Sequence, residues 1–198
     1  MSVILRNSPH RYGVVALSLH WLIAVLIVGM LILGTVMVDL TPGSSLQFQL
    51  YQLHKSFGIT ILALSLARLG WRLANPAPPL PNDLQPWERF LARVTHVSFY
   101  VLMIGMPLTG WMVVSASVWN VPTVLFGTIH LPHLPILSTL ENKKPVEDVL
   151  KEIHESAAWV VIALLVLHVA GALKHHLVLK DDVLTRMLPG RDLIRRSE

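Results

Sequence analysis

The chain has no cysteine and few charged side chains among its 198 residues. Without cysteine it forms no disulfide bond, thiolate metal site or iron–sulfur cluster. Charged residues make up 14% of the chain and hydrophobic residues 53%, and the mean hydropathy is +0.57. Charged residues make up about a quarter of a typical soluble domain, so this composition indicates a small integral membrane protein. No nucleic-acid-binding motif accompanies the net charge of +4, so we expect no nucleic-acid partner.

Four segments are apolar enough to cross a bilayer, which takes about 20 residues of helix. They lie at about 14–38, 54–73, 94–116 and 155–179. The first is longer than the apolar part of a signal peptide and lacks a cleavage motif, so we expect a permanent helix. The third contains Pro107, which predicts a kink. We therefore predict an all-α, four-helix membrane bundle that forms a single domain over residues 1–198.

The distribution of arginine and lysine predicts the orientation of the bundle, because cytoplasmic flanks collect these residues. Most of them precede the first segment, surround the second connection, or lie at the end of the last segment and beyond it: Arg6, Arg11, Arg68, Arg72, Arg89, Arg93, Lys174, Lys180, Arg186, Arg191, Arg195 and Arg196. Both termini are therefore expected in the cytoplasm. The connection at about 117–151 would lie outside, either on the membrane surface or across the end of the bundle.

Five of the ten histidines fall within the apolar segments or at their ends: His20, His54, His96, His154 and His168. Ionisable groups at membrane depth are candidates for function, although a single imidazole can simply link two helices. His154 and His168 are separated by fourteen residues, about four helical turns. They therefore share one face of a helix, about 21 Å apart along its axis.

The direction of each segment gives these two histidines their partners. His54 begins a segment that runs parallel to the last one, so it lies level with His154. His20 lies level with His168, and His96 is at a comparable depth. Two stacked imidazole pairs in a helix bundle predict two bis-histidine haems b. Zinc or copper would need three or four protein ligands, and the chain has neither thiolates nor an HExxH motif.

Two arginines and two glycines accompany the histidines. Arg68 and Arg72 return to the face of His54 at the inner end of the second segment, where they are expected to contact haem propionates. The alternative is that they only mark the cytoplasmic side. Gly58 and Gly171 each follow a histidine by about one turn, which would leave room for a flat macrocycle or for close helix packing.

A basic cluster follows the last segment. His175 lies seven residues after His168, and Lys174 and His176 flank it. Quinone reduction consumes protons, so this cluster is a candidate quinone site. The alternative is an anchor to lipid headgroups.

Several motifs resemble the bacterial cytochrome b561 family over about residues 11–189. They are SLHWL at 18–22, LHKSFGITILALSLARLGWRL at 53–73, NPAPPLP at 75–81, THVSFYVLMIGMPLTGW at 95–111, IHESAAWVVIALLVLHVAGALKHH at 153–176 and KDDVLTRMLP at 180–189. The resemblance implies a bacterial inner-membrane protein with two haems b. Its inner haem would be bound by His20 and His168, in preference to His96, and its outer haem by His54 and His154. It also implies electron transfer between a periplasmic reaction and the quinone pool.

Small members of that family are superoxide oxidases, so the resemblance implies a superoxide:ubiquinone oxidoreductase. An anionic donor would be attracted by the outer lysines, although four acidic residues dilute their charge. The lysines are Lys55, Lys143, Lys144 and Lys151, and the acidic residues are Glu141, Glu147, Asp148 and Glu152. No catalytic residue is assigned. The alternatives are a membrane anchor and electron relay for a periplasmic dehydrogenase or hydrogenase subunit, which would dock on the outer loop, and a structural protein without haem.

Overall fold

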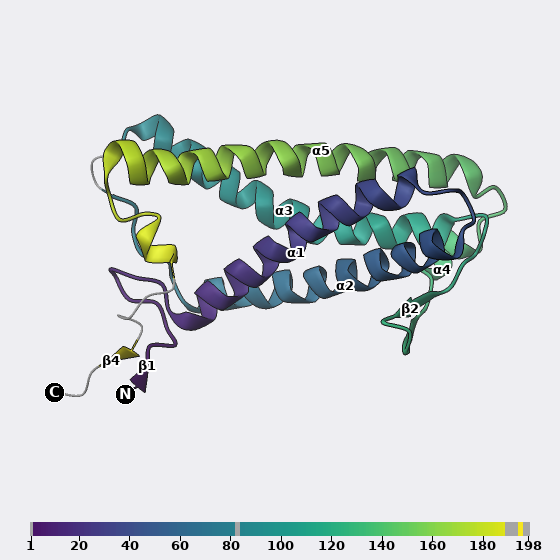
Figure 1. Cartoon of the computed structure of the whole chain (residues 1–198), viewed down its shortest axis with the longest axis horizontal. Helices are drawn as coiled ribbons and strands as arrows, with labels where there is room; N and C mark the ends of the chain where they lie inside the picture. Colours follow the sequence, from purple (N-terminus) through teal and green to yellow (C-terminus); the bar gives the residue numbers. More distant parts are fainter. Residues whose placement is uncertain (1, 82–83, 189–193, 196–198) are drawn as a thin grey trace.

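The computed structural model of the chain describes residues 2–81, 84–188 and 194–195. Within these residues four long helices lie side by side, and consecutive helices run in opposite directions (Figure 1). They are α1 (Val14–Asp39), α2 (Ser45–Ala74), α3 (Pro86–Ala116) and α5 (Lys144–Lys174). Each is long and apolar enough to cross a membrane, with α5 continued by a π-helical turn, His175–Leu179. The predicted architecture is confirmed in that the chain is mostly helical and has four helices able to span a membrane.

Three helices begin well before the apolar segments predicted from hydropathy. Ser44 caps α2, where its hydroxyl accepts a hydrogen bond from the Gln47 amide at 3.2 Å. A capping box formed by Gln85 and Glu88 begins α3. Hydropathy reports the part of a helix that lies in hydrocarbon, whereas caps and polar first turns decide where the helix starts. Because α5 begins at Lys144, the connection predicted over 117–151 ends at residue 143.

The bundle has close packing on three of its sides. Helix α1 packs on α2, α2 on α3, and α3 on α5, whereas α1 and α5 make no comparable backbone contact. The accessible surface is 12738 Å², compared with about 9,300 Å² for a compact monomer of this mass. The helices therefore bury little of one another, as expected where lipid covers their outer faces.

The two ends of the bundle carry different small elements. At one end, here called the terminal end, β1 (Ser2–Val3) pairs antiparallel with β4 (Ile194–Arg195). At the opposite, hairpin end, β2 (Thr123–Leu125) and β3 (Ile129–Leu131) form an antiparallel hairpin (Figure 1). The short helix α4 (Pro135–Ser138) follows β3.

Side chains of α2 attach the hairpin to the bundle through hydrogen bonds to its backbone. The Gln52 amide donates to the Pro122 carbonyl at 2.9 Å and accepts from the Val124 amide at 3.2 Å. The Ser56 hydroxyl accepts from the Phe126 amide at 2.9 Å. The segment 117–143 therefore lies across the end of the bundle, one of the two positions predicted for it.

A second segment folds back over the terminal end. The π-helical turn is followed by Lys180 in a left-handed conformation, with φ 55°. A 3₁₀ turn, Thr185–Met187, then brings the chain to α1, where the Trp21 indole donates to the Met187 carbonyl at 2.7 Å. Both ends of the bundle are thus closed by segments outside the four long helices.

Candidate functional site

Each long helix presents two residues toward the inside of the bundle, fourteen positions apart. Because fourteen residues make about four turns, the eight residues form two layers separated by about 21 Å. The hairpin-side layer consists of Gly34, His54, Gly110 and His154. The terminal-side layer consists of His20, Arg68, His96 and His168.

In the hairpin-side layer two imidazoles face each other between two glycines. The ring centres of His54 and His154 are 6.2 Å apart, and the ring planes are inclined by 74°. A Cβ atom on Gly34 would lie 3.4 Å from Cε1 of His54, and one on Gly110 would lie 3.1 Å from Cε1 of His154. The glycines therefore leave the space that the two rings occupy.

Sequence reasoning missed both of these glycines. It selected Gly58 and Gly171, beside which an added Cβ meets only Met30 Cε at 3.9 Å or no described atom within 4 Å. The signal that was available was the fourteen-residue interval, which links His20 to Gly34 on α1 as it links His154 to His168 on α5.

In the terminal-side layer, His168 lies between two other histidines. Its ring centre is 6.2 Å from that of His20 and 5.8 Å from that of His96. Phe99 packs edge-on against it at 5.4 Å. Distance alone does not choose between His20 and His96 as the partner of His168.

The imidazole pairs fit a group that brings its own equatorial ligands. Two imidazoles that bind one metal atom from opposite sides have ring centres about 6 Å apart, because each metal–nitrogen bond is about 2 Å long and the ring centre lies about 1 Å behind the nitrogen. The His54–His154 and His20–His168 pairs match this separation, and so does the His96–His168 pair. Within the described residues no group of three or more His, Cys, Asp or Glu side chains could hold a bare metal ion. A porphyrin needs only the two axial nitrogens.

Buried polar atoms on α2 also fit a bound anionic group. Nη1 of Arg68 and Oγ of Ser65 are buried and have no hydrogen-bond partner among the described residues. Arg68 interacts electrostatically with all three histidines of its layer. Arg72, one turn further on, is exposed and interacts with His96. Since a buried unpaired donor costs about 1–3 kcal/mol, the Arg68 guanidinium inside the bundle fits a carboxylate such as a haem propionate.

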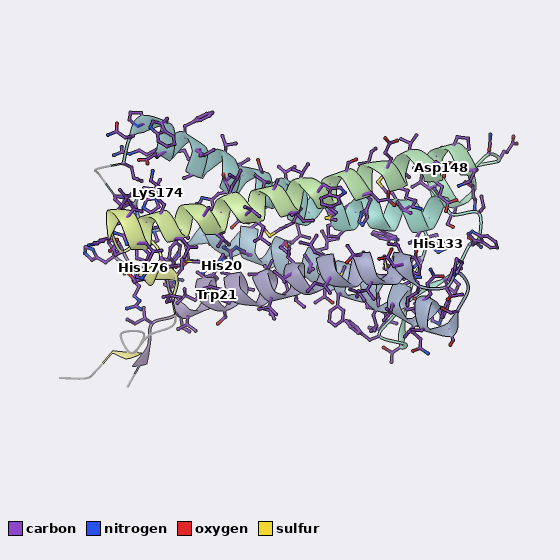
Figure 2. All side chains as sticks on the ribbon, turned by 45° about the horizontal axis from the view of Figure 1, so that its top comes forward. His20, Trp21, His133, Asp148, Lys174 and His176 are labelled. Atoms are coloured by element: carbon purple, nitrogen blue, oxygen red, sulfur yellow. The ribbon has the colours of Figure 1, made fainter. Side chains whose placement is uncertain are left out.

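The basic cluster at the end of α5 does not converge on one point. Lys174, His176 and His20 lie at the terminal end (Figure 2). Lys174 forms an ion pair with Glu88 at 2.6 Å, while His176 is exposed.

His175 instead pairs with Asp181, with Nδ1 and Oδ2 2.5 Å apart. This pair depends on the π-helical turn and the left-handed Lys180, which reverse the chain. Single π-helical turns are frequent at functional sites. No periodicity in the sequence indicated that Asp181 would return to His175.

The predicted outer lysines are largely engaged with neighbours. Lys144 pairs with Asp148 at 2.5 Å and Lys151 with Glu155 at 3.7 Å. Lys55 donates to the carbonyl of Pro122 at 3.0 Å. Exposed pairs of this kind contribute little stability, but they reduce the positive charge offered to an anion.

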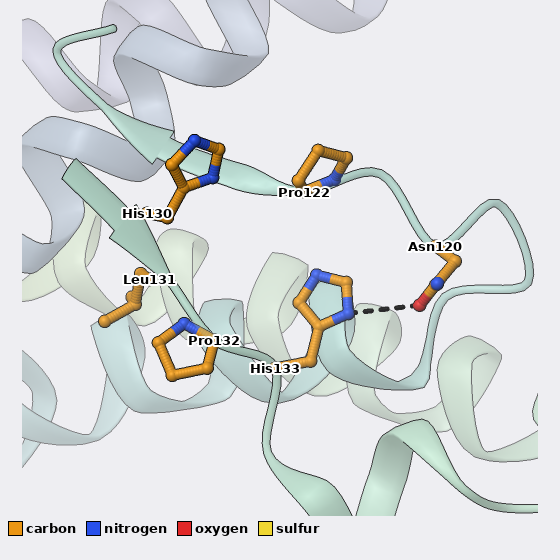
Figure 3. A pocket seen from close by; sticks show the side chains of 6 residues that line it. All are labelled: Asn120, Pro122, His130, Leu131, Pro132 and His133. Atoms are coloured by element: carbon orange, nitrogen blue, oxygen red, sulfur yellow. Dashed lines mark hydrogen bonds between the residues drawn. The ribbon is translucent and has the colours of Figure 1, made fainter. Parts of the chain in front are cut away.

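A shallow cavity of about 350 Å³ opens beside the hairpin (Figure 3). Its lining residues are Asn120, Pro122, His130, Leu131, Pro132 and His133. Both ring nitrogens of His133 lie within hydrogen-bond distance of an oxygen, Nδ1 3.1 Å from Asn120 Oδ1 and Nε2 3.2 Å from the Val121 carbonyl oxygen. These contacts give His133 a structural role in holding the loop.

Apolar helices that enclose paired imidazoles at two depths define a polytopic membrane protein with a built interior site. The family model described as prokaryotic cytochrome b561 matches residues 11–190. The chain belongs to the prokaryotic cytochrome b561 family, as its motifs predicted. Membership implies b-type haem and electron transport within a membrane.

Three relatives match nearly the whole chain. "Cytochrome b561 homolog 2" of Escherichia coli (strain K12) is 36% identical over 92% of this chain and 93% of its own length. "Probable superoxide oxidase CybB" of Yersinia pestis is 31% identical over 90% of this chain and 96% of its own. "Cytochrome b561 homolog 1" of Escherichia coli (strain K12) is 28% identical over 92% and 99%, respectively.

Proposed function

We propose that the chain is a di-haem cytochrome b of the bacterial inner membrane that transfers electrons between a donor at the hairpin end and ubiquinone at the terminal end. The observation that carries this proposal is the pair of facing imidazoles in each layer, with ring centres 6.2 Å apart. His54 and His154 would bind the hairpin-side haem, and His20 and His168 the terminal-side haem. Each haem supplies an iron that takes up and releases one electron.

The chain's own residues make this site suited to electron transfer. Two histidine ligands on each haem would leave its iron without an open coordination position, which would disfavour oxygen binding. Arg68, whose Nη1 is buried and has no hydrogen-bond partner among the described residues, would hold a propionate of the terminal-side haem. The layers are about 21 Å apart, compared with a hydrocarbon thickness of about 30 Å, so each would lie toward one membrane surface.

Superoxide is the donor we favour. One relative carries the name of a probable superoxide oxidase. In the balanced reaction, two superoxide anions each lose one electron and leave as dioxygen, and ubiquinone gains two electrons and two protons to become ubiquinol. Because Lys144 and Lys151 are paired, any attraction of the anion relies mainly on Lys55 and Lys143.

Ubiquinone would bind at the terminal end, where the basic residues predict the cytoplasmic side. The His175–Asp181 pair at this end would pass protons to the reduced quinone. Lys174 and His176 flank this pair from the same end of α5.

Haem content tests the first part of the proposal. The purified chain should show a sharp reduced α-band of haem b and contain two haems. His54→Ala and His154→Ala should each lose one haem and keep the other, whereas His130→Ala, a change on the exposed hairpin, should keep both. Two haems retained in both interior variants would refute the pairing.

Stopped-flow mixing with superoxide tests the donor. With ubiquinone present, rapid haem reduction followed by ubiquinol formation is expected. Absent or slow reduction of a fully loaded protein would favour the alternative, a membrane anchor and relay for a periplasmic dehydrogenase or hydrogenase subunit. In that case the segment 117–143 would be the docking surface, and the partner should copurify.

A further inference from the structure

Helix α3 provides neither of the proposed hairpin-side ligands, yet one of its side chains contacts His154. Oγ1 of Thr109 lies 3.0 Å from Nδ1 of His154. The same hydroxyl lies 2.8 Å from the carbonyl oxygen of Met106, one turn earlier on α3. Both contacts lie next to Gly110, which leaves room for the His154 ring.

The two contacts define which atom donates. A threonine hydroxyl has a single hydrogen, and the Met106 carbonyl can only accept it. Thr109 Oγ1 therefore accepts a hydrogen bond from Nδ1–H of His154. In this tautomer Nε2 carries the lone pair that binds a metal.

His54, the proposed ligand opposite His154, differs from it in hydrogen bonding. Nδ1 of His54 is buried and has no hydrogen-bond partner among the described residues. Only one of the two imidazoles in this layer is thus oriented by a neighbouring hydroxyl. Hydrogen bonding at the far nitrogen of a metal-bound imidazole fixes the ring and raises its basicity.

We propose that Thr109 is a positioning residue that fixes the tautomer of His154 and lowers the reduction potential of the hairpin-side haem. The inference rests on the proposed function, in which His154 binds that haem. A more basic imidazole stabilises the oxidised iron relative to the reduced iron, which gives the direction of the effect. It also gives a role to the threonine of the PLTG sequence in α3, which the ligand assignment leaves unexplained.

The test compares Thr109→Val, which keeps the shape and removes the hydroxyl, with Thr109→Ser, which keeps the hydroxyl. Each purified holoprotein is titrated electrochemically, and the hairpin-side haem is identified as the one that His54→Ala loses. At a fixed potential, Thr109→Val should raise the reduced-to-oxidised ratio of that haem about fivefold, or about 40 mV, the effect of one lost hydrogen bond. Thr109→Ser should change the ratio less than twofold, and the other haem should be unaffected.

Each outcome bears on the inference. Loss of the hairpin-side haem from Thr109→Val but not from Thr109→Ser would also support it. Unchanged potentials in a fully loaded Thr109→Val protein would overturn it, and so would equal shifts in both variants, which indicate packing alone. Failure of the proposed function is recognised separately, because wild-type protein would then lack two haems or His154→Ala would retain both.

Discussion

Replacing Gly110 by alanine is expected to weaken the hairpin-side haem site, although the change adds one methyl group. The new Cβ would lie 3.1 Å from Cε1 of His154 and 3.6 Å from Nδ1. Carbon atoms in contact are usually about 3.5–4.0 Å apart, so the ring must move by several tenths of an ångström. That movement opposes the hydrogen bond from the ring to Thr109.

The structure supplies a matched control on the same helix. A Cβ on Gly105 would meet no described atom within 4 Å. Gly105→Ala should therefore gain up to about 1 kcal/mol from helix propensity, with no steric cost. Gly110→Ala has the same gain in helix propensity, but overpacking against the His154 ring costs about 1–3 kcal/mol. Gly34→Ala, at 3.4 Å from His54, should be intermediate.

The assay is the affinity of the hairpin-side haem, measured as the haem-to-protein ratio during titration with haem, together with its visible spectrum. A penalty of about 1–3 kcal/mol corresponds to a roughly 5- to 150-fold loss of affinity in Gly110→Ala relative to Gly105→Ala. The terminal-side haem serves as an internal reference in each sample. Equal affinities in Gly110→Ala and Gly105→Ala would refute the reasoning that the glycine makes room for His154.

Three further predictions concern the terminal-side layer and the quinone end. His20→Leu should remove the terminal-side haem while His96→Leu keeps it, as measured by haem content; the reverse result would make His96 the ligand. Arg68→Leu should lower the affinity of that haem about tenfold and Arg68→Lys much less, because a lysine still supplies a charge to a propionate; equal effects would exclude a charge-based contact. Asp181→Asn should slow ubiquinol formation at least fivefold while the rate of haem reduction by the donor stays unchanged, because His175 loses its carboxylate partner; a parallel fall in both rates would assign the pair a structural role.

For α3 the sequence predicted the helix and a candidate ligand, but not the contacts that the helix makes with its neighbours. The helix and its internal Pro107 were predicted, and His96 was recognised as a rival for the inner site. The structure places His96 as close to His168 as His20 is, so distance does not decide which of the two is the partner of His168. The role of Thr109 could not be predicted from the sequence, because a threonine in an apolar helix indicates no function until the residue that faces it on the neighbouring helix is known.

The connections were harder to predict than the helices. The connection predicted over about 117–151 was expected on the membrane surface or across the end of the bundle, but its attachment to Gln52 and Ser56 depends on where the hairpin meets α2. The outer lysines were expected to attract an anion, yet the start of α5 at Lys144 places two of them four residues before an acidic side chain. Helical spacing decides such ion pairs, and hydropathy underestimated the length of this helix.

By itself the sequence determined the four spans and the fourteen-residue interval that places His154 and His168 on one face, because hydrophobic length and helical periodicity are local properties. Because consecutive spans run in opposite directions, the depth of each histidine in the bundle followed as well. Only the tertiary structure decided what lies across from each ring: Gly110 and Thr109 at His154, Gly34 at His54, and Asp181 at His175. These contacts depend on how the helices are rotated and shifted against one another, which no single helix encodes.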